Sequence, residues 1–187
     1  MKLKITLTAF ILGTVGFTSA QGTFIYDQQS TGITDGGFFL SATPFGQSFT
    51  PTLDSLGFVD LQLSSGVSTT IDVNIRSGSI TGLLLGTSMP VTLQGSSSGV
   101  FDFLFSNPVT LTPGTQYFFE PVVVGPGDAQ ANTTSIQYPG GDLIANGAPV
   151  TAGDLWFREG VVTAVPEPAS ATLLVVAGVL FWKRRKL

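Results

Sequence analysis

The sequence of 187 residues contains neither histidine nor cysteine. Without histidine the chain has no imidazole base or imidazole metal ligand, and it can form no Ser-His or Cys-His nucleophile pair. Without cysteine it has no disulfide and no thiol chemistry, so its stability has to come from a buried core. These absences remove most hydrolase mechanisms and leave a pair of carboxyl groups, as in glycoside hydrolysis, as the enzymatic alternative.

Positive charge is nearly absent from the middle of the chain. Between residues 21 and 163 there are nine Asp and two Glu but only two cations, Arg76 and Arg158, which gives this region a formal charge of −9 (2 − 11). The other six cations lie at the two ends: Lys2, Lys4, Lys183, Arg184, Arg185 and Lys186. Because phosphate contacts need cationic groups, we expect no nucleic-acid partner. A surface of this charge keeps a domain soluble and away from anionic polymers, or gathers divalent cations.

Residues 1–20 have the organisation of a secretory signal. Two lysines form the charged start, residues 5–17 form the apolar run, and small residues lead to a cleavage site between Ala20 and Gln21. An uncleaved membrane anchor is the alternative, but an apolar run of thirteen residues is short for one. We therefore expect an N-terminal signal helix on the precursor and a mature chain that begins at Gln21.

Short apolar segments separated by Gly, Ser, Thr, Asn and Asp fill residues 21–163, and no window keeps a helical apolar face over ten residues. Apolar and polar residues alternate in the segments 69–76 and 100–105, as in half-buried strands. The core side chains predicted from this alternation are Ile71, Val73, Ile75, Phe101, Phe103 and Phe105. Further strands are predicted at 23–27, 46–50, 58–63, 83–93, 116–124, 134–138 and 155–162.

About nine short strands without helices predict an all-β fold, a single β-sandwich or jelly roll of antiparallel strands. In residues 111–117, Pro113 and Gly114 fit the central positions of a type II turn and Tyr117 follows shortly after. This segment resembles the tyrosine corner of Greek-key sandwiches, in which a tyrosine hydroxyl bonds to upstream backbone. Together with residues 47–51 and 71–78, it loosely resembles the β-sandwich modules of bacterial surface proteins.

Residues 164–187 combine three features in a fixed order. The motif Pro166-Glu167-Pro168 is followed by fourteen uncharged residues, 169–182, and then by the basic tail 183–187. As a transmembrane helix the uncharged run would span about 21 Å, which is short for a hydrocarbon core of about 30 Å, although snorkelling cations add to its reach. The positive-inside bias would keep the basic tail in the cytoplasm and the rest of the chain outside.

This arrangement resembles the PEP-CTERM sorting signal of Gram-negative bacteria that produce exopolysaccharide, over about the last two dozen residues. The resemblance implies that secretion machinery exports the protein, that its C-terminus anchors it in the inner membrane, and that an exosortase recognises it there. Cleavage near Pro166-Glu167-Pro168 would then pass the protein to the cell envelope, the cell surface or the extracellular matrix. An ordinary C-terminal anchor with a chance Pro-Glu-Pro is the alternative.

Aromatic rings beside polar or Gly-rich segments are the candidates for contact with a sugar, because a ring offers a flat apolar platform. These rings are Tyr26, Tyr138, Trp156 and Phe157. For Trp156, burial in the core is the competing interpretation. With the sorting signal, they favour a non-catalytic binding or structural module in contact with exopolysaccharide. The rivals are a glycosidase that uses Glu120, Glu159 or an Asp as its carboxyl pair, and a structural surface protein without a ligand.

Calcium is the metal that this composition permits, because it takes oxygen ligands from carboxylates and backbone carbonyls in Gly-rich loops. Three loops have such a composition, at 35–37, 125–128 and 140–142. None matches an EF-hand loop, and Asp beside Gly is also common in turns. We therefore assign no metal site and expect no cofactor.

Overall fold

The computed structural model describes residues 22–151 and 153–163, and every regular element in them is a β-strand. The predicted signal peptide with its cleavage site and the predicted sorting signal at 164–187 lie outside these residues. Within the described ranges no helix has the length and hydropathy needed to cross a bilayer.

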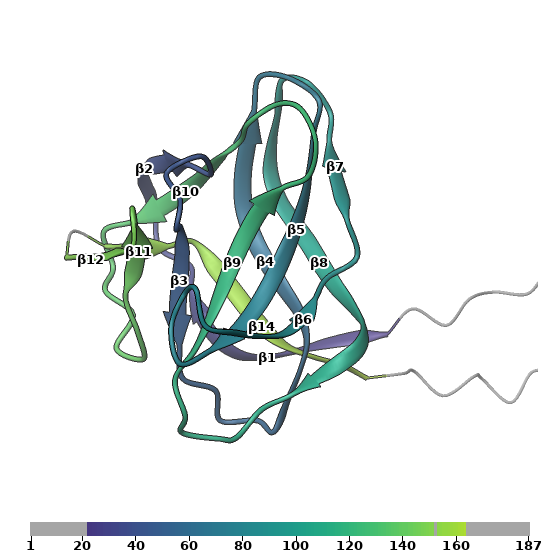
Figure 1. The fold of residues 1–187 in the computed structure, drawn as a ribbon, viewed down its shortest axis with the longest axis vertical. Coiled ribbons are helices and arrows are strands. Elements are labelled where there is room, and N and C mark those ends of the chain that lie inside the picture. Colours follow the sequence, from purple (N-terminus) through teal and green to yellow (C-terminus); the bar gives the residue numbers. More distant parts are fainter. Residues whose placement is uncertain (1–21, 152, 164–187) are drawn as a thin grey trace, which may run out of the picture. The chain divides into compact units, whose positions relative to one another are not determined.

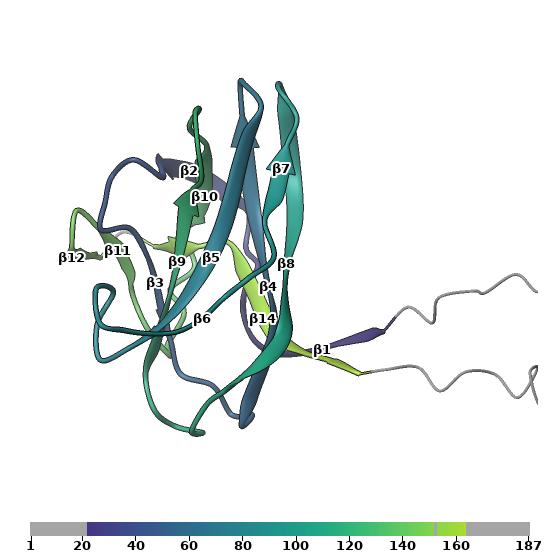
Figure 2. The same cartoon turned by 45° about the vertical axis from the view of Figure 1, so that its right-hand side comes forward.

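The strands form two antiparallel sheets of seven strands each (Figures 1 and 2). Sheet A has the order β1-β14-β4-β10-β13, with β2 also paired to β10 and β8 to β4. Its strands are β1 (Thr23–Ser30), β2 (Thr34–Phe39), β4 (Ser55–Ser65), β8 (Ser97–Thr110), β10 (Gln130–Thr134), β13 (Asp154–Leu155) and β14 (Phe157–Thr163). Sheet B has the order β12-β11-β3-β9-β5-β6, with β7 also paired to β5. Its strands are β3 (Gly46–Phe49), β5 (Thr69–Ser77), β6 (Leu83–Thr87), β7 (Val91–Leu93), β9 (Tyr117–Val123), β11 (Leu143–Ala145) and β12 (Ala148–Val150).

One main hydrophobic core takes side chains from both sheets, which is compatible with a β-sandwich. Val59 and Leu61 of β4 and Phe103 of β8 belong to it, as does Phe119 of β9. Of the six predicted core side chains, five are buried, and Phe101 is partly buried and packs against the same core. The alternation of apolar and polar residues therefore identified the inner faces of β5 and β8 correctly.

The described residues form more strands than the sequence predicts, and β4 and β8 are longer than predicted. The segment predicted as one strand at 83–93 is split into β6 and β7, because the N–H of Met89 bonds across to Leu104 O in the other sheet at 2.7 Å. The strand predicted at 134–138 is wrong, since β10 ends at Thr134 and the N–H of Tyr138 bonds to Asp154 Oδ2 instead of to a strand. The sequence analysis also missed β2, β11, β12 and β13.

The predicted tyrosine corner is confirmed. The hydroxyl of Tyr117 accepts a hydrogen bond from the N–H of Thr112 at 3.0 Å. Thr115 N donates to Thr112 O at 3.1 Å, and Gly114 has a φ of 76°, as the third position of a type II turn requires. The corner fixes the entry into β9, the strand between β3 and β5.

Candidate functional site

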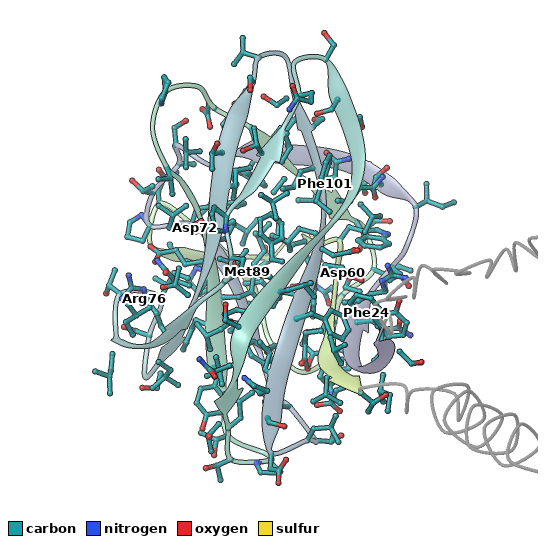
Figure 3. All side chains as sticks on the ribbon, turned by 90° about the vertical axis from the view of Figure 1, so that its right-hand side faces the viewer. Phe24, Asp60, Asp72, Arg76, Met89 and Phe101 are labelled. Carbon is teal, nitrogen blue, oxygen red and sulfur yellow. The ribbon has the colours of Figure 1, made fainter. Side chains whose placement is uncertain are left out.

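A cluster of charged and aromatic side chains lies on the outer face of sheet A, around Arg158 of β14. Phe157 and Glu159 are buried on either side of it, so the alternation of the strand turns Arg158 to the outside. The strand register puts Arg158 opposite Asp60 of β4, and Asp60 opposite Asp102 of β8. Figure 3 shows Asp60 on the same side of the molecule as Phe24 of β1.

The Arg158 guanidinium and the Asp60 carboxylate form an ion pair, with Nη2 and Oδ2 2.8 Å apart. The Asp60 side chain is only 1% exposed, and its Oδ1 has no hydrogen-bond partner among the described residues. The Nε of Arg158 is likewise buried without a partner there. Burial and the neighbouring Asp102 charge raise the pKa of Asp60 to about 7, although Arg158 opposes this.

Two aromatic rings lie against the same guanidinium. The Cζ of Arg158 is 4.6 Å from the centroid of the Tyr26 ring and 5.2 Å from that of the Trp156 ring. Both distances are within the range of cation–π interactions. Tyr26, Asp60, Asp102, Trp156 and Arg158 are called the Arg158 face from here on.

The backbone between β13 and β14 explains the position of Trp156. Its N–H donates to Asn132 O at 2.8 Å and its carbonyl accepts from Gln62 N at 3.4 Å, so the residue bridges β10 and β4. Leu155 and Phe157 on either side are both fully buried, whereas Trp156 is partly buried and turned outward. Full burial in the core, the competing interpretation of this tryptophan, is therefore wrong.

A β-bulge explains the position of Tyr26. The pairing of β1 with β14 shifts between Tyr26 and Gln28, which leaves Asp27 as an extra residue. Tyr26 stacks edge-on against the outer face of sheet A at Phe58, with ring centroids 5.6 Å apart. Asp27 instead accepts a hydrogen bond from the N–H of Leu53, and Gln28 accepts one from the hydroxyl of the buried Tyr138. The ring of Tyr26 remains 45% exposed and accessible to a ligand.

Tyr138, the third predicted contact, does not join the Arg158 face. It is 7% exposed, and its hydroxyl donates to Gln28 Oε1 at 2.9 Å while accepting from Thr50 N. Burial is the main cause that raises the pKa of Tyr138 to about 12. Its side chain lines a polar cavity of about 560 Å³ with Asp142 and Asp154. Tyr138 therefore supports the loops around this cavity through both of its hydrogen bonds.

Asp27 and Glu159 form a second acidic pair, on the inner side of sheet A. Burial and the Asp27 charge raise the pKa of Glu159, which is 1% exposed, to about 8. Burial alone would also raise the pKa of Asp27, but hydrogen bonds from Thr52 and Leu53 outweigh it and lower that pKa. A carboxyl group as deeply buried as Glu159 cannot reach a polymeric substrate. Glu120, the other named carboxyl of the glycosidase alternative, forms an ion pair with Arg76.

Of the three loops considered for calcium, the loop 125–128 has an aspartate that already accepts two hydrogen bonds. Asp128 accepts from Ser41 Oγ at 2.7 Å and from the N–H of Ala129 at 2.8 Å. No group of three or more acidic side chains placed to hold a metal ion occurs in residues 22–151 and 153–163. Calcium therefore remains a metal that the composition permits, with no site assigned to it.

Sequence reasoning named two members of the Arg158 face, Tyr26 and Trp156, and missed the three charged ones. A signal for Asp60 was present, because it is the only charged residue in the predicted strand 58–63. Asp102 has the same signal in the predicted strand 100–105, whereas Arg158 shares its predicted strand with Glu159 and does not stand out in this way. The chain matches no protein-family model and no curated protein sequence.

Proposed function

We propose that this chain is an exported, non-catalytic module of the cell envelope or extracellular matrix that binds polysaccharide through the Arg158 face. In this proposal residues 21–163 form a single β-sandwich of the jelly-roll type. The observation that carries the proposal is the meeting of Tyr26 and Trp156 at Arg158, from two ends of the sequence.

The chemistry of the Arg158 face suits a sugar. Rings such as Tyr26 and Trp156 can pack on the apolar face of a pyranose, while charged and polar groups next to them bond to hydroxyls. Asp102 is exposed and supplies acceptors for such bonds. An outer sheet face also suits a polymer better than a deep pocket does, because the polymer can extend beyond the face in both directions.

The ends of the sequence supply the address in this proposal. The signal peptide would bring the chain to the inner membrane, and an exosortase would recognise the sorting signal that begins at Pro166-Glu167-Pro168. Cleavage would then release the domain or transfer it to the surface or the matrix, where exopolysaccharide is present.

Binding is tested with the full-length protein in non-ionic detergent and the exopolysaccharide of its own host, by affinity electrophoresis or calorimetry. Tyr26→Ala and Trp156→Ala should each weaken saturable binding by roughly tenfold, as expected when a central aromatic contact is lost. Phe39→Ala is the matched control, because Phe39 is an exposed aromatic residue of sheet A, 59% exposed, on a different strand. No reducing ends should form.

Three results would overturn the binding proposal. They are an absence of saturable binding, equal effects of the Phe39 and Trp156 substitutions, and reducing ends that accumulate with protein concentration. The last of these would establish the glycosidase, and the first would leave a structural surface protein.

The sorting part is tested by mass spectrometry of the protein recovered from its host. Processing predicts a C-terminus near Pro166-Glu167-Pro168, and Glu167→Ala should leave an unprocessed precursor in the membrane with an unchanged fold. Recovery of all the protein with Leu187 intact would refute processing.

A further inference from the structure

The charges of the described residues restrict which polysaccharides the Arg158 face can hold. Arg76 and Arg158 are the cationic side chains of residues 22–151 and 153–163, and both are already paired, with Glu120 and Asp60. The formal charge of residues 21–163 is −9 (2 − 11). A polymer of uronic acids would thus meet repulsion and no unpaired arginine in this part of the chain.

The Arg158 face contains two carboxyl groups, those of Asp60 and Asp102, but one guanidinium. Arg158 satisfies one oxygen of Asp60, while the buried Oδ1 of Asp60 has no donor among the described residues. Asp102 lies directly opposite, close enough to bond to Asp60 when one of the two carboxyls holds a proton. Two carboxyls against one guanidinium leave a place for one more positive charge, which a shared proton or a ligand can supply.

An ammonium group matches this place better than a hydroxyl does. It carries three hydrogen-bond donors and a positive charge, whereas each carboxylate offers only acceptors. The faces of the Tyr26 and Trp156 rings lie against the Arg158 guanidinium, so the rings contribute a platform for the sugar and not a second cation site. Exposed Asp102 is the group that an incoming ligand reaches first.

We propose that the Arg158 face selects polysaccharides with free amino groups, such as de-N-acetylated hexosamine polymers, with Asp102 receiving the ammonium group beside the unpartnered oxygen of Asp60. This inference rests on the proposed polysaccharide binding, since it names the class of sugar that the same face takes. Tyr26 and Trp156 provide the platform for the sugar ring, and Asp102 determines the charge preference.

The test compares oligomers of glucosamine with fully N-acetylated oligomers of the same length, near pH 7, where Asp60 can lose its proton and an amine can keep one. Calorimetry with the full-length protein should give about tenfold tighter binding of the amino oligomer, a difference typical of a hydrogen bond between two charged groups. Asp102→Asn should remove this preference, because it weakens binding of the amino oligomer about tenfold more than binding of the acetylated oligomer. Asp35→Asn is the matched control, because Asp35 is an exposed aspartate of β2, so the same charge is lost elsewhere on sheet A.

The outcomes separate this inference from the proposal beneath it. Equal binding of both oligomers, lost in Trp156→Ala, would overturn the amine preference and keep polysaccharide binding. A third outcome is that neither oligomer binds but the host exopolysaccharide does. The inference then requires that chemical N-acetylation of this polysaccharide weakens its binding, and that Asp102→Asn weakens it too. If neither change weakens binding of the polysaccharide, the inference is refuted. If nothing binds, both proposals fail.

Discussion

The outer face of each sheet carries one arginine–carboxylate pair, and the two pairs have different surroundings. On sheet B, Arg76 Nε and Glu120 Oε2 are 2.7 Å apart, Asn74 also donates to Glu120, and Arg76 Nη1 donates to Gly82 O. On sheet A, the Arg158–Asp60 pair is as short, but Asp60 is almost fully buried, keeps an oxygen without a donor and faces another acid. Figure 3 shows Arg76 and Asp60 on opposite sides of the molecule.

This difference separates a pair that joins strands from a pair that suits a ligand. Glu120 of β9 accepts hydrogen bonds from Asn74 and Arg76 of β5, so these bonds join the two strands. Arg76 also donates to nearby backbone, so the polar groups of this pair have partners. At the Arg158 face the unsatisfied atoms and the exposed ring of Tyr26 gather in one place. Buried polar groups normally have hydrogen-bond partners. The Arg158 face, where buried polar atoms have none among the described residues and exposed rings lie beside them, is therefore the better candidate for a ligand site.

The largest effect on stability should come from removing Arg158, with removal of Arg76 as the comparison. Arg158→Met leaves the buried carboxylate of Asp60 without its cation, so we expect a loss of about 3–5 kcal/mol in the free energy of unfolding at pH values above the pKa of about 7 of Asp60, where this carboxyl is charged in the unsubstituted protein. Arg76→Met should cost no more than about 1 kcal/mol, because Arg76 and Glu120 retain 22% and 15% exposure and water can replace the bonds. Urea-induced unfolding of both variants measures the difference.

The cost of Arg158→Met should shrink at acidic pH, where Asp60 is protonated and no longer needs a cation. Equal losses of stability in the two arginine variants, or a loss in Arg158→Met that does not change with pH, would mean that the two ion pairs stabilise the fold in the same way.

The next effect is a pH dependence that arises in sheet A. The pKa of Glu159 is raised from 4.5 to about 8, so between these values the folded protein holds a proton that the unfolded chain has lost. Stability must therefore fall as the pH rises through this window, and Asp60 adds to the fall up to about pH 7. Glu159→Gln, which mimics the protonated carboxyl, should be more stable than the unsubstituted protein by less than about 1 kcal/mol at pH 5 and by about 4 kcal/mol at pH 8.

Glu120→Gln on sheet B is the control for this prediction, because it leaves Glu159 in place and should retain the fall in stability. The measurement is urea unfolding at several pH values. A slope that persists in Glu159→Gln at its full size would assign the pH dependence to other groups.

The sequence predicted what depends on local pattern and missed what depends on pairing between distant strands. The inner faces of β5 and β8 follow from alternation, and the corner at Tyr117 follows from the turn residues before it. The cluster of Asp60, Asp102 and Arg158 instead depends on a register between strands that lie far apart along the chain. No spacing within the sequence encodes that register.

The outward positions of the Tyr26 and Trp156 rings also depend on how the strands pair. Tyr26 faces outward because a one-residue bulge separates it from Gln28, and Trp156 faces outward because its backbone bridges two neighbouring strands. Burial in the core was the competing interpretation of Trp156 because of the general burial tendency of its residue type. Alternation with Leu155 and Phe157, which are both buried, instead turns this ring to the outer face, where its backbone pairs with β4 and β10.

The smallest effect separates the charge of Arg158 from its shape. Arg158→Lys keeps a cation near Asp60 but loses the planar guanidinium that lies over the rings of Tyr26 and Trp156. We expect a loss of about 1 kcal/mol in unfolding free energy, the size of one or two partly exposed cation–π contacts, and weaker polysaccharide binding because both rings lose their support. Arg76→Lys on sheet B should change neither property measurably, and thermal unfolding with affinity electrophoresis covers both. If the two lysine variants behave alike, the rings of the Arg158 face are positioned by the strands alone and the guanidinium serves only to neutralise Asp60.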